Sequence, residues 1–249
     1  MYQDHMESNG LRDKMKVELI SYSNLGEKVC GIGARTCTSD KIPTKEDDTS
    51  KALRSAISSG HESILEHFTM TFAVSGVSRA LTHQLVRHRI GISYSQQSQR
   101  YVNMEEFEYV TPASMDDRVI VESYDFFANR DVYITIRKEY ADIMEYLRKC
   151  YKRMVDAGIP EEDARYILPN ACCTNIIVTV NARELRHIAE ERMCAKAQWE
   201  IRELVTEMVR QAKEVAPTLF ADVGPECEKT HICYERNGCG RYPKHVVIE

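Results

Sequence analysis

The sequence predicts a single α+β domain with a mixed, mostly antiparallel sheet and long helices. Three observations favour this fold class. Apolar and polar residues alternate, as they do in strands, at 16–23 and 68–77. Apolar residues recur every three or four positions, as they do in helices, at 136–157 and 197–215. The two kinds of segment also mix without the regular strand–helix–strand alternation that indicates a parallel sheet.

Length and composition allow this fold. The chain has 249 residues, and its hydrophobic content of 43% suffices for a packed core. We expect a disordered extension or an expression remnant at 1–14, one domain at 15–222 and a cysteine-rich tail at 223–249. No run of about 18 apolar residues occurs, so we expect no membrane partner.

The chain start and the cysteines bear on the compartment. Residues 1–14 are polar and lack the apolar region of a secretory signal. Nine cysteines form an odd set scattered through the chain, which favours reduced thiols over a disulfide framework. We therefore expect a cytoplasmic protein.

Residue patterns in the first half of the chain predict its elements in order. Ser78 is a candidate N-cap, and Gly60 and Gly91 are candidate helix ends. The expected elements are a strand at 16–23, a short helix within 23–37, a loop at 39–50, a helix at 50–60, a strand at 68–77, a helix at 78–89 and a strand at 106–112.

The second half begins with a long amphipathic helix at 136–157, closed by Gly158 and Pro160. Pro160 also suits the first position of a helix over 160–169. A β-branched strand at 173–180 and helices at 181–193 and 197–215 follow. Asn181 with Glu184 resembles a capping box at the start of the first of these helices.

One stretch of the chain carries cations and no acid. Residues 87–101 read RHRIGISYSQQSQRY, and no Asp or Glu lies between Glu66 and Glu105, although the chain has 38 acids against 33 Lys and Arg. At that average, about six acids are expected in the interval. Arginine pairs with phosphate and carboxylate, so the stretch indicates a pocket for a phosphorylated polar molecule. The alternative is a solvated basic loop.

Three other features have plain structural alternatives. GHESILEH at 60–67 has His and Glu at spacings that could bind a metal, but solvated helix residues are more common. The charges of 181–192 are interleaved, which is typical of paired surface charges. Ser98 has no acid or lysine near it in the sequence, which argues against a covalent nucleophile. The familiar GxGxxG, Walker, HExxH and GxSxG motifs are absent.

The tail brings four candidate zinc ligands together in the sequence, namely Cys227, His231, Cys233 and Cys239. Their spacing contains no CxxC pair, which structural zinc sites usually have. We therefore expect a disordered or loosely packed tail and assign no metal, with zinc as the alternative.

Four segments together resemble the flavin-dependent thymidylate synthase family. RHRIGISYSQQSQRY is similar to the family signature of RHR, seven or eight residues and Ser, here with eight between Arg89 and Ser98. The other three are GHESILEH at 60–67, ARYILPNA at 164–171 and NARELRHIAEERMCAKAQWEI at 181–201, in the family's order.

The resemblance implies a methyltransferase that reductively methylates dUMP to dTMP. Methylenetetrahydrofolate would supply the carbon and leave as tetrahydrofolate, and FAD reduced by NADPH would supply the hydride. It further implies a homotetramer whose active sites are shared between subunits. A phosphate, a pyrophosphate and a folate carboxylate would each need cations, which gives the acid-free stretch a chemical purpose.

The resemblance also implies roles for individual residues. The catalytic group would be Arg192, His61 and Ser98, with Arg192 stabilising negative charge on the uracil and Ser98 positioning substrate without attacking it. The FAD contacts would be Ser63, Arg87, His88, Arg89, Gln96, Asn181, Arg183 and His187. The dUMP contacts would be Gln84, Arg87, Gln96, Gln97, Ser98, Gln99, Arg100, Arg165 and Arg192.

Two other classes of function stay open on the residues alone. A nucleotide- or nucleic-acid-binding module could use the basic stretch without catalysis, although the net charge of −5 disfavours a nucleic-acid partner. A zinc-stabilised protein could use its tail to organise a partner surface. Uptake of a yellow cofactor that bleaches with NADPH distinguishes the enzyme from both.

Overall fold

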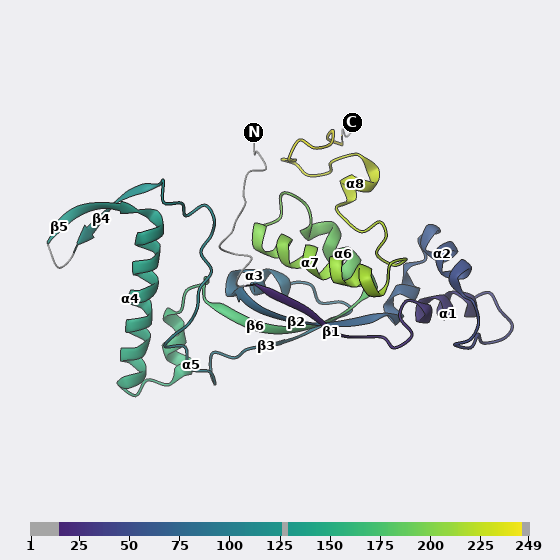
Figure 1. Ribbon diagram of the computed structural model, residues 1–249, viewed down its shortest axis with the longest axis horizontal. Helices are drawn as coiled ribbons and strands as arrows, with labels where there is room; N and C mark the ends of the chain where they lie inside the picture. Colours follow the sequence, from purple (N-terminus) through teal and green to yellow (C-terminus); the bar gives the residue numbers. More distant parts are fainter. Residues whose placement is uncertain (1–14, 126–128, 246–249) are drawn as a thin grey trace.

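The computed structural model describes residues 15–125 and 129–245, so the expected extension at 1–14 lies outside the described residues. Four strands form the main sheet in the order β1-β2-β6-β3, and every pair of neighbours is antiparallel. The strands are β1 (Lys16–Tyr22), β2 (Thr69–Ser78), β3 (Ile92–Gln96) and β6 (Cys173–Asn181). Figure 1 shows helices over one face of this sheet.

The helices over the sheet bury the main core. They are α3 (Arg79–Leu85), α6 (Ala182–Arg192) and α7 (Trp199–Val215), with α1 (Lys28–Thr36), α2 (Ser50–Ser58) and the 3-10 helix η1 (Glu62–His67) beyond one end. Alternate residues of β2 and β6, such as Phe72 and Val178, are fully buried against the helices. Each buried side chain of this size contributes about 1.5–3 kcal/mol. The alternation predicted for these strands is thus the core-facing pattern.

A second, smaller part extends from the sheet. A hairpin of β4 (Ile120–Asp125) and β5 (Arg130–Thr135) leads directly into the long helix α4 (Ile136–Asp156), followed by α5 (Glu161–Ala164) and the 3-10 helix η2 (Arg165–Ile167). This part has its own cluster of buried side chains. The cluster includes Cys172, which lies next to the start of β6 in the main sheet. The members are Met104, Phe107, Met144, Tyr151, Ala164 and Cys172.

Most of the predicted elements are present, and three predictions need correction. The segment 106–112 is not a strand; it makes only an isolated bridge between Tyr109 and Cys172. The helix predicted to Arg89 ends at Leu85, and the first part of the polar run after Gly91 forms strand β3, which was not predicted. The tail contains helix α8 (Glu226–Thr230) and a buried Cys233, so its described part is not disordered.

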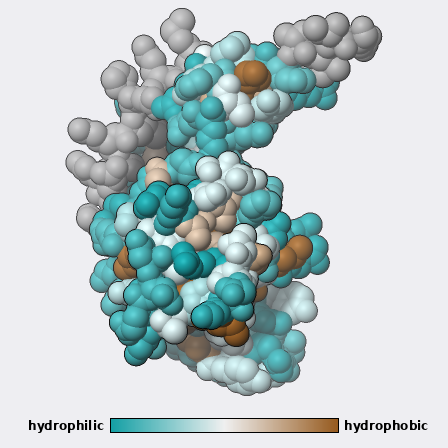
Figure 2. Space-filling view, turned by 90° about the vertical axis from the view of Figure 1, so that its right-hand side faces the viewer, coloured by the Kyte–Doolittle hydropathy of each residue, from teal (hydrophilic) through white to brown (hydrophobic). Residues whose placement is uncertain are grey.

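The surface of the protein is mainly polar on the side shown in Figure 2. The side that carries α1 and α2 is mainly hydrophilic, with scattered apolar residues (Figure 2). In the two described stretches of the chain, no helix combines the length and apolar character that a membrane crossing requires.

Candidate functional site

Two groups of polar residues lie at opposite ends of strand β3. The His88 cluster, near the start of β3, consists of His88, Glu184, His187, Glu191 and Arg192. The Arg79 cluster, near its end, consists of Arg79, Gln97, Gln99, Arg100, Glu162 and Arg165. Both contain residues from distant parts of the sequence.

Local contacts place His88 at the end of α3. The hydroxyl of Tyr94 on β3 donates to the carbonyl of Leu85 at 2.7 Å and of His88 at 3.1 Å, which holds the turn after the helix. Gly91 has a φ of +70°, a region that favours glycine. A Cβ there would lie 2.3 Å from the side-chain nitrogen of Asn181, so only glycine lets the turn approach β6.

His88 is buried and holds Arg192. Arg192 Nε donates to His88 Nε2 at 3.2 Å, and His88 Nδ1 faces Glu184 Oε1 at 3.6 Å. Burial lowers the pKa of His88 most, and the positive charge of Arg192 lowers it further. A neutral ring with its proton on Nδ1 satisfies both contacts, because Nε2 must then accept.

His187 and Glu191 complete this cluster on the exposed face of α6. The rings of His88 and His187 lie edge to face, with centroids 6.2 Å apart, and His187 Nε2 lies 3.5 Å from Glu191. Ligand atoms of His88, His187 and Glu191 lie within 4.8 Å of one another. The geometry disfavours a metal ion there, because Arg192 uses the Nε2 lone pair of His88 and brings its own charge.

The start of α6 joins the GHESILEH segment. Asn181 caps the helix by accepting from the backbone N–H of Glu184 at 2.8 Å, as the capping pattern predicts. Arg183 pairs with Glu66 at 2.6 Å across to η1. His61 and Ser63, at the start of that segment, are exposed.

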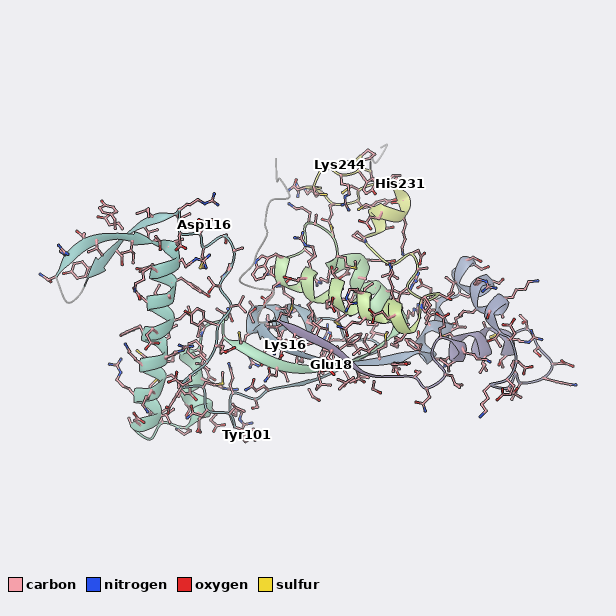
Figure 3. All side chains as sticks on the ribbon, viewed as in Figure 1. Lys16, Glu18, Tyr101, Asp116, His231 and Lys244 are labelled. Carbon is pink, nitrogen blue, oxygen red and sulfur yellow. The ribbon has the colours of Figure 1, made fainter. Side chains whose placement is uncertain are left out.

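The Arg79 cluster ties the end of β3 to α5 and η2. Arg100 Nε pairs with the carboxylate of Glu162 at 2.9 Å, and Arg165 Nε donates to the backbone carbonyl of Glu162 at 3.0 Å. Tyr101, next to Arg100, lies on the opposite side of the sheet from the tail (Figure 3). Arg79 donates to the carbonyl of Gln97 at 3.3 Å and to Gln99 Oε1 at 3.2 Å.

Arg79 is the site residue that sequence reasoning missed. Burial lowers the pKa of its guanidinium, while the nearby Arg165 adds a smaller effect in the same direction. The described hydrogen bonds of Arg79 go to neutral oxygens, so its positive charge is available to an anion. The available signal was its position as the first arginine of the acid-free interval.

The remaining predicted residues are placed as follows. Gln96 donates to Thr82 at 3.0 Å, and Gln84 to the carbonyl of Ala80 at 3.5 Å. Ser98 Oγ accepts from the backbone N–H of Arg100 at 3.2 Å, and the described contacts place no activating base beside it. Arg87 and Arg89 are exposed beside the His88 cluster.

One chain does not bring all the predicted arginines together. Strand β3 has five residues and so spans about 17 Å between the clusters. Arg87 and Arg192 lie at one end, while Arg100 and Arg165 lie at the other. The contacts of these four arginines therefore belong to two separate groups within one chain.

Sequence comparison decides the family. A model of the family described as thymidylate synthase complementing protein matches residues 18–218. The flavin-dependent thymidylate synthase of Clostridium tetani is 41% identical over 234 residues, covering 91% of this chain and 94% of that protein. The chain belongs to the flavin-dependent thymidylate synthase family.

Other relatives in the family agree. The flavin-dependent thymidylate synthase of Geobacter sulfurreducens is 43% identical over 221 residues, covering 86% of this chain and 88% of that protein. The flavin-dependent thymidylate synthase of Pyrococcus furiosus is 44% identical over 200 residues, covering 77% of this chain and 75% of that protein. The segments whose resemblance to the family was noted in the sequence all lie within the matched range.

Proposed function

We propose that this protein is a flavin-dependent thymidylate synthase that methylates dUMP to dTMP. Methylenetetrahydrofolate supplies the carbon and NADPH reduces the flavin. The observation that carries the proposal is the hydrogen bond between Arg192 and His88, because it joins the RHR signature to the helix of the NARELRHIAEER segment. Two family segments that are far apart in the sequence thus meet in the fold, which supports the proposal.

The residues near α6 fit an FAD. The N-terminus of a helix and the cationic residues beside it attract a pyrophosphate. When bound, the reduced flavin supplies the hydride. We assign FAD binding to Ser63, Arg87, His88, Arg89, Gln96, Asn181, Arg183 and His187.

The Arg79 cluster fits the phosphate of dUMP. Arg100 binds the carboxylate of Glu162, so its guanidinium is already oriented toward an anionic group. A phosphate would compete with Glu162 for this cation. We assign dUMP binding to Gln84, Arg87, Gln96, Gln97, Ser98, Gln99, Arg100, Arg165 and Arg192.

Arg192 is the proposed electrostatic catalyst. Its guanidinium has five donors, of which the contact with His88 uses one, so others remain for the uracil edge. A positive charge held there stabilises the negative charge that builds up during the reaction. His88 acts through Arg192 as a positioning residue, and its neutral state preserves the accepting Nε2. His61 is proposed to lie near the flavin ring.

The proposed assembly is a homotetramer in which the His88 cluster of one chain and the Arg79 cluster of another form each site. The separation of about 17 Å along β3 supports this arrangement. We propose that folate binds at the same shared site and that the enzyme acts in the cytoplasm, where its nine free thiols would stay reduced. The boundaries of the domain at 15–222 and the tail at 223–249 stay predictions.

The test is dTMP formation from dUMP, methylenetetrahydrofolate, FAD and NADPH, with each reagent omitted in turn. Full activity should need all four, and the yellow protein should bleach with NADPH under anaerobic conditions. A purified protein that takes up no flavin, or that makes dTMP without it, would overturn the proposal.

A further inference from the structure

Helix α8 brings the tail against the end of α6, away from the Arg79 cluster. Lys229 of α8 pairs with Glu190 of α6 at 2.7 Å. Figure 1 shows α8 above α6, and Figure 3 labels His231 and Lys244 in the tail on this side of the molecule. Helix α6 ends at Arg192, and Cys194 follows in the turn before α7. The tail is thereby held beside Cys194.

The fold of the tail then gathers its cysteines. The N–H of Cys233 donates to the carbonyl of Pro243 at 2.7 Å, and the N–H of His245 donates to the carbonyl of Cys233 at 2.8 Å, so the chain doubles back across Cys233. Gly238 lies so close that a Cβ there would be 2.7 Å from Cys233 Sγ. Because Cys239 directly follows Gly238, this close approach brings Cys239 toward Cys233. Cys233 itself is buried.

The cysteines lie within electrostatic reach of one another. Burial raises the pKa of the Cys227 thiol most, and the neighbouring sulfurs of Cys194, Cys233 and Cys239 raise it further. The side chains of Cys194, Cys233 and Cys239 thus all lie near that of Cys227. His231, which the spacing in the sequence had suggested, instead lies against the ring of Tyr242 with centroids 5.4 Å apart.

We propose that Cys194, Cys227, Cys233 and Cys239 bind one structural zinc ion, which fastens the tail to the end of α6. Four cysteine thiolates in a tetrahedron form a closed zinc site with Zn–S distances of about 2.3 Å. Among the described residues no three of these sulfurs lie within 4.8 Å of one another, so the proposal requires the thiol side chains to turn toward the ion. The site does not depend on the proposed enzymatic function.

The structure favours zinc over disulfides. All nine cysteines are free, and the four belong to two separate stretches of chain that meet only through the fold. Zinc takes all four sulfurs at once and displaces their protons, because the thiolate is the ligand. The same ion would restrain the helix that carries Arg183, His187 and Arg192.

The test measures metal in the full-length protein. Elemental analysis after gel filtration should find about one zinc ion per chain. Cobalt exchanged for zinc should give the visible absorption of a tetrahedral thiolate site and a sulfur-to-metal charge-transfer band in the near ultraviolet. Cys239→Ser and Cys194→Ser should each lose most of the bound zinc and change the cobalt spectrum.

Cys37→Ser is the matched control, because Cys37 is also a free cysteine, is exposed and bonds locally to the carbonyl of Gly33 in α1. It should keep its zinc. Absence of zinc from the wild-type protein after incubation with zinc alone would overturn the proposal. So would full zinc in Cys194→Ser, or four thiols found as two disulfides in protein purified without reductant.

Discussion

At the residue scale, the central feature is the pair formed by the buried His88 and the partly exposed Arg192. An isolated buried histidine only loses solvation, but this one accepts from a guanidinium at 3.2 Å and faces a carboxylate at 3.6 Å. The pair gives Arg192 a defined direction, which long side chains otherwise lack because they have many rotamers.

We predict that Arg192→Ala lowers kcat by at least about 100-fold, as loss of a charge-stabilising donor does. Ser98→Ala should keep measurable turnover, because Ser98 positions substrate and does not attack it. Steady-state kinetics measure both, and Arg210→Ala, an exposed arginine paired with Glu207 and Glu214, is the control. An inactive Ser98→Ala that still binds dUMP and FAD would refute the role assigned to Ser98.

His88 should also make stability depend on pH. Its folded pKa is lowered from 6.5, chiefly by burial and then by Arg192, while Glu191 opposes and His187 adds to the shift. Below about pH 6.5 the unfolded chain therefore binds more protons than the folded one, and stability falls as pH drops through that value.

Urea unfolding at pH 7.5 and 5.5 measures this dependence, and His88→Gln, which keeps an acceptor for Arg192, should reduce it. Glu184 faces the same ring and has a pKa raised by burial, an effect of opposite sign that remains in both proteins. Equal losses of stability in wild type and His88→Gln would contradict the prediction.

At the element scale, Gly91 allows the turn after α3 to lie close to the start of α6. Gly91 ends the turn after α3 and lies against Asn181, the N-cap of α6. One residue thus sets the distance between the RHR segment and the helix that carries Arg183 and Arg192. Tyr94 adds a second restraint on the same turn.

Gly91→Ala should destabilise the protein by roughly 2–3 kcal/mol. The left-handed conformation costs an alanine about 1–2 kcal/mol, and displacing the cap of α6 costs about 1 more. Gly158→Ala is the control, because Gly158 has a similar φ of +86° but a Cβ there meets nothing within 4 Å. Urea midpoints compare the two variants, and equal losses would show that contact with Asn181 has no cost.

At the scale of the whole molecule, the separation of the two clusters is the main finding. The Arg79 cluster is held by α5 and η2, whereas the His88 cluster belongs to α3 and α6. Strand β3 lies between them. The proposed assembly would bring the His88 cluster of one chain to the Arg79 cluster of another.

Mixed oligomers test this arrangement. Arg192→Ala and Arg100→Ala should each be nearly inactive, but co-expression of the two should restore activity in roughly a quarter of the sites, since random mixing leaves that share with both native residues. The specific activity of purified mixed oligomers measures the recovery, and two differently tagged Arg192→Ala chains are the control. No recovery above the single variants would place both residues of each site in one chain.

The sequence alone predicted the long elements and the family. Alternation identified β2 and β6, and helical spacing identified α4 and α7, because these patterns report which face of an element is buried. The N-caps Ser78 and Asn181 were likewise predicted, since capping depends on neighbours only a few residues away.

The tertiary structure decided which distant residues meet. Strand β3 was missed because its polar residues pair with β6, a partner about eighty residues away in the sequence. Other long-range contacts place Arg79 beside Gln99, Arg192 beside His88 and helix α8 of the tail beside α6. Local patterns record the burial of a segment, but only sheet register and helix packing determine what it is buried against.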